Sequence, residues 1–209
     1  MAGHPAAFAE GSGVKTLLVG TTNADKLREI TTLLTDLPIE LRALTAYPNL
    51  PPAEETGATY MENARVKAMH YSRQTGLPTM AEDTGFEIEA LDCEPGLASA
   101  RFLGPHASFS ARFQEIYSRL HERGANGSHA RFACALVLAT PERIVFETEQ
   151  AVEGLLAMIP RGTNGHGYDP IFLYPPLGRT FGELSEVEKS SVSHRGKAVR
   201  ALREFLKTW

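Results

Sequence analysis

Hydrophobic residues switch between strand-like and helix-like spacings along the first third of the chain. An apolar run at 17–19 ends at Gly20, and apolar residues then recur at intervals of three and four, which is typical of an amphipathic helix. The pattern predicts a strand over 15–20, a helix over 24–36 and a strand over 39–44. A second helix is expected over 58–75, with an apolar face made of Tyr60, Ala64, Ala68 and Tyr71.

The rest of the chain continues this alternation and adds a hairpin. The stretch MAEDTG, at 80–85, is predicted to end a short strand in acids, and a helix capped by Ser108 is predicted over 108–123. Two strand-rich stretches, 130–140 and 143–159, flank the turn residues TPER, which indicates a hairpin. A long loop over 160–184 precedes a closing helix over 194–207. Early alternation with a late hairpin predicts an α/β fold with a mixed sheet.

Length and composition narrow the class of protein. The 209 residues suffice for one large domain or one domain with two lobes, and we expect a flexible tail over 1–13 followed by a single domain over 14–209. The tail has neither a basic leader nor a long apolar run, so it is not interpreted as a signal peptide. The formal net charge of -4 argues against a nucleic-acid-binding protein.

Two further features bear on the cellular setting. No apolar stretch approaches the ~20 residues that a membrane helix needs, so no membrane partner is expected. Cys93 and Cys134 are the two cysteines, and they lack CxxC spacing. A reduced, cytoplasmic setting is therefore predicted rather than a disulfide scaffold or a cysteine metal site.

The segment TTNADK, residues 21–26, joins the first predicted strand to its helix. A helix N-terminus offers free N–H groups and a partial positive charge, both of which suit phosphate, and Lys26 adds a full charge. The segment is not a Walker loop, because Asp25 stands where that motif has a glycine. The alternative interpretation is a surface turn in which Asn23 caps the helix.

Acidic residues cluster in two places. Glu54 and Glu55 precede the second helix, and Glu82 and Asp83 lie in MAEDTG. Carboxylates of this kind can hold Mg²⁺ together with substrate phosphates, and Asp83 can activate a water. The alternative is an ordinary acid-bearing turn. Asn63, Lys67 and His70 share one face of the helix, and the first two gain significance only if an acidic or phosphate-binding group faces them.

Two later segments carry candidate chemistry. GTNGHGYDP, at 162–170, is rich enough in glycine to approach a flat ligand closely, with His166 and Tyr168 able to stack on a base and Asp169 able to accept its N–H groups. EKSSVSHRGKA, at 188–198, places four basic or imidazole side chains around a helix start capped by Ser193. That charge opposes the helix dipole, so a bound anion is expected there. The alternative for 162–170 is a flexible surface loop, and the alternative for 188–198 is an exposed basic rim.

Five segments in order, TTNADK, EETGATYMENARVKA, AEDTGFEIEALDCEPGLASARF, GHGYDPIF and EKSSVSHRGKA, closely resemble the inosine triphosphate pyrophosphatase family over residues 15 to 207. The resemblance implies hydrolysis of ITP, dITP and XTP to the monophosphate and pyrophosphate with Mg²⁺ as cofactor. It also implies an elongated, two-lobed α/β fold around a long mixed sheet, with the substrate in the cleft between the lobes, and a homodimer.

The resemblance also implies roles for single residues. Asp83 matches the proton acceptor and a metal ligand, and Glu54 matches the second metal ligand. The implied contacts to the purine nucleoside triphosphate come from Thr21, Thr22, Asn23, Ala24, Asp25, Lys26, Lys67, Thr84, His166, Gly167, Tyr168, Asp169, Lys189, His194 and Arg195.

The chain departs from the family pattern at two positions. His166 stands where many members have a phenylalanine that stacks on the purine, and Glu82 stands where many bacterial members have aspartate. Imidazole stacks with less area, whereas Glu82 keeps a carboxylate. Two alternatives stay open: a pyrophosphatase for pyrimidine or modified nucleotides, and a non-catalytic nucleotide sensor.

Overall fold

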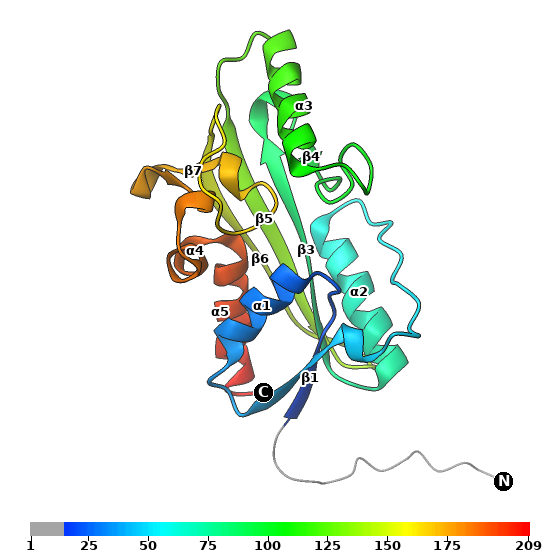
Figure 1. Cartoon of the computed structure of the whole chain (residues 1–209). Coiled ribbons are helices and arrows are strands. Elements are labelled where there is room, and N and C mark those ends of the chain that lie inside the picture. Colours follow the sequence, from blue (N-terminus) through cyan, green and yellow to red (C-terminus); the bar gives the residue numbers. More distant parts are fainter. Residues whose placement is uncertain (1–14) are drawn as a thin grey trace, which may run out of the picture.

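The computed structural model describes residues 15–209 as an elongated α/β structure (Figure 1); the tail predicted over 1–13 lies outside the described residues. Within them, five α-helices surround one eight-stranded mixed sheet. The strands are β1 (Lys15–Val19), β2 (Ile39–Ala43), β3 (Thr79–Ile88), β4 (Pro95–Gly96), β5 (His129–Ala139), β6 (Ile144–Leu156), β7 (Phe172–Tyr174) and β8 (Arg179–Thr180). The helices are α1 (Ala24–Leu34), α2 (Tyr60–Thr75), α3 (Phe109–Glu122), α4 (Glu186–Val192) and α5 (His194–Leu206).

The predicted elements are confirmed, with four differences, one of which is the two-residue strand β4, which was not predicted. β3 does not end at the acids but continues to Ile88, because Phe86 and Ile88 are buried and β5 pairs with all ten of its residues. The predicted loop over 160–184 contains β7 and β8, which are too short for a periodic pattern. α4 was missed because it is a short helix of 7 residues capped by Ser185 and buries a lysine, Lys189, rather than an apolar stripe.

The sheet has the order β2-β1-β3-β5-β6-β7-β8, with β4 paired to β3. β1 runs parallel to β2 and β3, whereas the other pairings are antiparallel. β3, β5 and β6 are long strands that extend from one end of the molecule to the other, as Figure 1 shows. Both predicted lobes therefore contain parts of these three strands.

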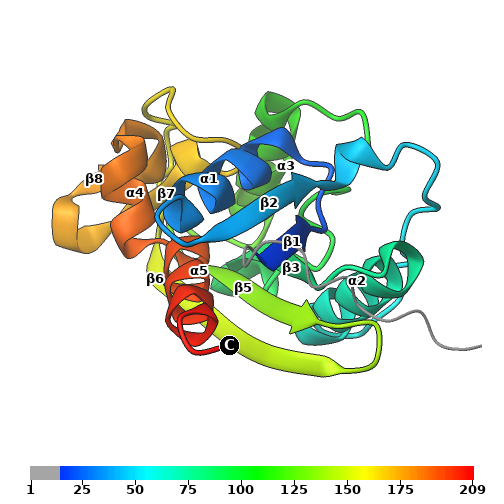
Figure 2. The same cartoon turned by 90° about the horizontal axis from the view of Figure 1, so that it is seen from below.

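The lobe that contains both chain ends of the described region has three layers (Figure 2). α1 and α5 pack side by side on one face of the sheet, where Ile30 and Leu202 join a buried cluster with Met80 of β3. α2 covers the opposite face, where Ala64 and Ala68 pack against small residues of β3 and β5. The predicted apolar face of the second helix is confirmed, since all four of its members are buried.

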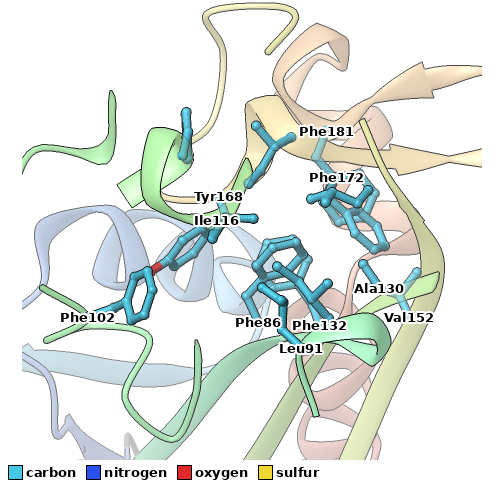
Figure 3. Close-up of a cluster of buried hydrophobic side chains, with 14 of the residues drawn as sticks. Phe86, Leu91, Phe102, Ile116, Ala130, Phe132, Val152, Tyr168, Phe172 and Phe181 are labelled. Carbon is cyan, nitrogen blue, oxygen red and sulfur yellow. The ribbon is translucent and has the colours of Figure 1, made fainter. Parts of the chain in front are cut away.

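The second lobe has an aromatic core (Figure 3). Phe86 of β3 lies against Phe132 of β5 with ring centroids 4.9 Å apart, and Phe172 and Phe181 pack on one side of this pair. α3 closes the cluster with Ile116 and its buried neighbours. The two lobes therefore have separate cores joined by continuous strands.

Candidate functional site

A pocket of about 330 Å³ lies between the lobes, where the edge of β3 is open. β1 pairs with β3 only at Thr79 and Met80 and ends at Val19, so β3 continues beyond its neighbour. The first lobe supplies the loop from Gly20 to Asn23 and residues of α1 and α2, and the second supplies residues 97–101, Phe109 and the loop at 166–169. The predicted cleft between lobes is thus confirmed.

The adjacent acids of β3 point to opposite faces of the sheet, because side chains alternate along a strand. Asp83 faces α2, where it meets Asn63 and Lys67. Glu82 faces α1 and α5, where it meets Lys26 and Arg195. The two carboxylates therefore have different partners, and they do not form one four-carboxylate cluster with Glu54 and Glu55.

Asp83 is held by two donors from α2. Asn63 Nδ2 donates to Asp83 Oδ2 at 3.0 Å, and Lys67 Nζ donates to Oδ1 at 3.0 Å. The orientation of the Asn63 amide is fixed in turn, since its Oδ1 accepts the N–H of Gly57 at 2.8 Å. Lys67 also contacts Glu55 Oε2 at 3.1 Å. Asn63 and Lys67 were expected to matter only if an acidic or phosphate-binding group faced them, and Asp83 is such a group.

The structure brings Glu55, not Glu54, to the pocket. Both side chains are exposed, but Glu55 is part of the pocket lining and Glu54 is not. Gly57 holds this loop close to α2, because a Cβ there would come within 2.7 Å of the Glu62 side chain and 2.8 Å of Asn63 Oδ1. A glycine is therefore needed where the acidic loop approaches the helix.

Glu82 is buried in a cationic setting. Arg195 Nε lies 2.9 and 3.0 Å from its two oxygens, and Lys26 Nζ lies 3.2 Å from Oε1. Burial alone would raise the pKa of Glu82, but the charges of Arg195 and Lys26 outweigh burial and lower that pKa to about 2. Glu82 is consequently an ionised counter-charge that holds two cations at the pocket wall.

Glu29 of α1 is a site residue that the sequence reasoning missed. Its Oε1 accepts from Lys189 Nζ at 2.8 Å, and its Oε2 accepts from Arg195 Nη1. Burial would raise the pKa of Glu29, but hydrogen bonding from His166 and the charges of Arg195 and Lys189 lower it well below its usual range. The available signal was its spacing of three from Lys26, which places both on one face of the helix.

The positive charge around the start of α5 is balanced by protein carboxylates. Ser193 is the predicted cap, accepting the N–H of Gly196 at 3.1 Å. Arg195 bonds Glu82 and Glu29, and Lys189 bonds Glu29 and Asp169, the latter at 2.7 Å. The local charge count behind the expectation of a bound anion therefore missed the distant carboxylates that pair with Lys189 and Arg195, and anion binding here stays a prediction.

The loop after β1 combines a cap with a lysine. Asn23 Oδ1 accepts the N–H groups of Asp25 and Lys26 at 2.9 and 3.1 Å, so the capping interpretation holds for its oxygen. Lys26 Nζ crosses the pocket to Thr84 Oγ1 at 2.9 Å. Asp25 instead pairs with Arg28, and neither Asp25 nor Ala24 lines the pocket.

The glycine-rich loop places Asp169 and Tyr168 in the protein interior. Asp169 Oδ2 accepts both Lys189 Nζ and the backbone N–H of His166, each at 2.7 Å. Gly165, with φ +71°, allows this, because a Cβ there would meet Asp169 Oδ2 at 2.1 Å. Tyr168 is only 4% exposed and does not offer the free stacking face that the sequence suggested. Gly167 does not line the pocket.

His194 brings a nitrogen atom without a hydrogen-bond partner to the pocket wall. Within the described residues, His194 Nδ1 is a buried atom that lacks such a partner, whereas His166 Nε2 lies 3.5 Å from Glu29 Oε1. The His194 ring stacks on Phe132 at 4.8 Å, and burial, with the charge of Arg195, lowers its pKa well below the usual value. The neutral imidazole of His194 can pair through this nitrogen with a polar atom of a ligand.

Arg112 of α3 is a second residue that the sequence reasoning missed. It is 3% exposed and donates to the carbonyls of Ser99, Ala100 and Gly104, so it anchors the pocket wall at 97–101. A buried arginine on an otherwise amphipathic helix gives no local signal. The structure thus gathers these predicted residues around one pocket: Thr21, Thr22, Asn23, Lys26, Lys67, Asp83, Thr84, His166, Tyr168, Asp169, Lys189, His194 and Arg195.

Comparison with known proteins agrees with this architecture. Two curated relatives are called dITP/XTP pyrophosphatase: the protein of Syntrophobacter fumaroxidans is 44% identical over 190 residues (90% of this chain, 81% of the relative), and that of Geobacter sulfurreducens is 41% identical over 192 residues (91% and 96%). A solved HAM1 protein from Coxiella burnetii superposes with a TM-score of 0.87 at 37% identity, covering 94% of this chain and 100% of that one.

Two further findings complete the comparison. Among residues 15–209, no helix is long and apolar enough to cross a membrane. The sequence model of the Ham1 family matches residues 17–205, which is nearly the whole chain and includes every residue of the pocket. The resemblance drawn from the five segments is confirmed, and the chain belongs to the Ham1 family.

Proposed function

We propose that this chain hydrolyses non-standard purine nucleoside triphosphates, ITP, dITP and XTP, to the monophosphate and pyrophosphate. The observation that carries the proposal is the single pocket that joins Lys26 and Lys67 at one carboxylate-bearing strand to the buried polar groups of the second lobe. The names of the curated relatives, dITP/XTP pyrophosphatase, support the same substrate class. Clearing such nucleotides from the pool is the role that follows.

The triphosphate is expected to lie along the first-lobe wall. The N-terminus of α1 and the ammonium groups of Lys26 and Lys67 provide positive potential for its oxygens, with the hydroxyls of Thr21, Thr22 and Thr84 beside them. Each lysine now pairs with a carboxylate, so phosphate binding exchanges one anionic partner for another. Positioning and electrostatic stabilisation of this kind dominate phosphoryl-transfer catalysis.

Asp83 is the proposed general base. Its carboxylate would take a proton from a water that attacks the α-phosphorus in line, with pyrophosphate as the leaving group. Asn63 and Lys67 hold the two oxygens in place, and the Gly57 N–H holds Asn63. This arrangement orients the base before the substrate arrives.

The donor set fits Mg²⁺ bound together with substrate. Among residues 15–209, no three His, Cys, Asp or Glu side chains gather closely enough to hold a metal ion by themselves. Mg²⁺ needs only one or two carboxylates plus substrate phosphates, and Asp83 and Glu55 share contact with Lys67 at the pocket wall. Asp83 with Glu55, or with the Glu54 that the resemblance implies, would hold the ion. When bound, Mg²⁺ neutralises charge on the phosphates.

The purine base is expected to meet the second lobe. Asp169, Lys189, His194 and Arg195 are buried polar groups on that side of the pocket, the last two from the start of α5, and each is 4% exposed or less. A 6-oxo purine can satisfy such groups, whereas the 6-amino group of adenine would leave donors facing donors and the 2-amino group of guanine would go unpaired or clash. Unpaired buried polar groups discriminate strongly between substrates.

Hydrolysis of ITP in ¹⁸O-labelled water tests the reaction directly. Attack at the α-phosphorus places the label in the monophosphate and none in pyrophosphate. Label in pyrophosphate would show attack at the β-phosphorus, and release of orthophosphate would show a different reaction. Binding of ITP without turnover would favour a non-catalytic nucleotide sensor. Turnover restricted to pyrimidine or modified nucleotides would favour a pyrophosphatase for those nucleotides. The homodimer and the cytoplasmic location stay predictions.

A further inference from the structure

Aromatic rings on the pocket wall differ sharply in what they expose. Phe86, Phe132 and Tyr168 are 0%, 8% and 4% exposed, and Tyr71 on the phosphate side is 7% exposed. Phe109, the first residue of α3, is 40% exposed although it lines the same pocket. A large apolar side chain that is both exposed and part of the pocket lining is a candidate contact for a ligand.

Tyr168 is committed to the protein core. Its ring stacks on Phe86 with centroids 5.0 Å apart and an interplanar angle of 19°, and its hydroxyl donates to the Ser99 carbonyl at 2.9 Å. Figure 3 shows the ring among the side chains of the second-lobe cluster. Because one face and the hydroxyl are already in use, Tyr168 supports the pocket rather than presenting a stacking surface to a ligand.

His166 presents a polar edge rather than an apolar face. Its Nε2 lies 3.5 Å from Glu29 Oε1, next to Lys189. An imidazole held in a network of charges gives less apolar contact area than a phenyl ring. The pocket therefore lacks an apolar platform at the two aromatic positions of the glycine-rich loop.

Phe109 stands directly beside that loop. Its ring meets Tyr168 edge to face, with centroids 5.3 Å apart at 87°, and a Cβ on Gly167 would touch Phe109 at 3.7 Å. The guanidinium of Arg112 lies 4.8 Å from its ring centroid, and that arginine is fixed by the carbonyls of residues 99–104. The ring is thus held in place on the protein side and open on the pocket side.

We propose that Phe109 supplies the apolar surface on which the base of the bound nucleotide packs, a specificity-determining contact from α3 of the second lobe. The inference rests on the proposed function, since it identifies the base contact of that same site. Packing of a base on an aromatic ring stabilises it without demanding particular hydrogen-bonding groups. Phe109 would therefore add affinity for the base, while the buried polar groups select among bases.

The test compares Phe109→Ala and Phe109→Trp with the wild type. Loss of a base–aromatic contact predicts a KM for ITP that is about tenfold higher in Phe109→Ala, with kcat changed by less than about twofold. Phe109→Trp should restore the KM. Inhibition by inorganic tripolyphosphate, which has no base, should be unchanged in all three proteins. Ile159→Ala, at a residue that is 74% exposed and outside the pocket lining, serves as the matched control.

Other results would overturn the inference. An unchanged KM in Phe109→Ala would exclude a base contact, as would a parallel loss of tripolyphosphate affinity. A change in oligomeric state without a change in KM would assign Phe109 to a subunit interface. The dissociation constants of ITP and tripolyphosphate, measured by calorimetry in chelator, keep the two proposals separate: ITP binding in chelator with no hydrolysis once Mg²⁺ is added contradicts the proposed reaction, yet Phe109 is still tested by its effect on ITP affinity.

Discussion

Lys67 and Asp83 form a contact of 3.0 Å between Nζ and Oδ1 at the wall of the pocket, and both side chains are nearly buried. They come from different elements, α2 and β3, and meet because α2 packs on the face of the sheet to which Asp83 points. The contact orients the proposed base and places a cation where the phosphates would pass.

Replacing the proposed base tests the reaction assignment. Asp83→Asn keeps the size and can still hydrogen-bond Asn63, but it cannot accept a proton from water. We expect kcat to fall by about 10²- to 10⁴-fold, the usual contribution of a general base, with the melting temperature little changed. Asp36→Asn, at an exposed carboxylate paired with Arg203, should leave kcat unaltered. An Asp83→Asn enzyme that kept most of its turnover would refute the assignment.

The two acids of the Pro-rich loop should differ in metal dependence. Glu55 lies in the pocket within 3.1 Å of Lys67, whereas Glu54 is exposed outside it. Glu55→Gln should therefore raise the Mg²⁺ concentration needed for half-maximal activity by about tenfold or more, and Glu54→Gln should raise it less. Titrating activity with Mg²⁺ in both variants decides the matter. The reverse order would return the ligand role to Glu54.

Glu29 should stabilise the second-lobe cations. Glu29→Gln leaves Lys189 with Asp169 and Arg195 with Glu82, so the loss in unfolding free energy should be about 2–3 kcal/mol, below the ~3–5 kcal/mol seen when a buried charge loses its sole partner. Chemical denaturation measures this quantity. Glu186→Gln removes an exposed pair with Arg28 and should cost less than about 1 kcal/mol. Equal losses in the two variants would contradict the buried network.

The pH dependence of stability should have two components. Glu82 has a folded pKa of about 2 against 4.5 unfolded, so its contribution is complete above pH 4.5 and is lost as the pH falls toward 2. His194 has a folded pKa well below its unfolded value of 6.5, so the unfolded state binds more protons and stability falls as the pH drops below 6.5.

The variant His194→Phe isolates the second component, since phenylalanine keeps the stacking on Phe132 without titrating. Wild-type unfolding free energy should decline more steeply than that of the variant below pH 6.5, by up to about 1.4 kcal/mol per pH unit. Identical slopes of unfolding free energy against pH between 6.5 and 5 would show that the pKa of His194 does not differ between the folded and the unfolded protein.

Local sequence patterns predicted elements and cap residues well. The strand and helix around Gly20, the buried stripe of α2 and the cap at Ser193 follow from spacing and turn chemistry, which act within a few residues. The pairing of Asn63 and Lys67 with an acid could be stated only as a condition. It depends on β3 and α2 meeting in space, which no local pattern encodes.

Long-range charge balance was the part that sequence could not supply. Glu29 and Arg195 are 166 residues apart, and their contact cancels the positive charge that local reasoning assigned to a bound anion. The position of Tyr168 was also set by long-range packing. Its aromatic ring suited a stacking contact with a base, but the ring packs on Phe86. The sequence pattern did not predict α4, because this helix is short and buries Lys189 through ion pairs rather than an apolar face.

The most direct test of the account is pyrophosphate release from ITP, XTP, GTP, ATP and UTP in parallel, each with Mg²⁺ and with chelator. The account predicts fast release from ITP and XTP that requires Mg²⁺, with little release from GTP, ATP and UTP. Absence of release from every purine nucleotide, or equal release from ATP and ITP, would contradict it.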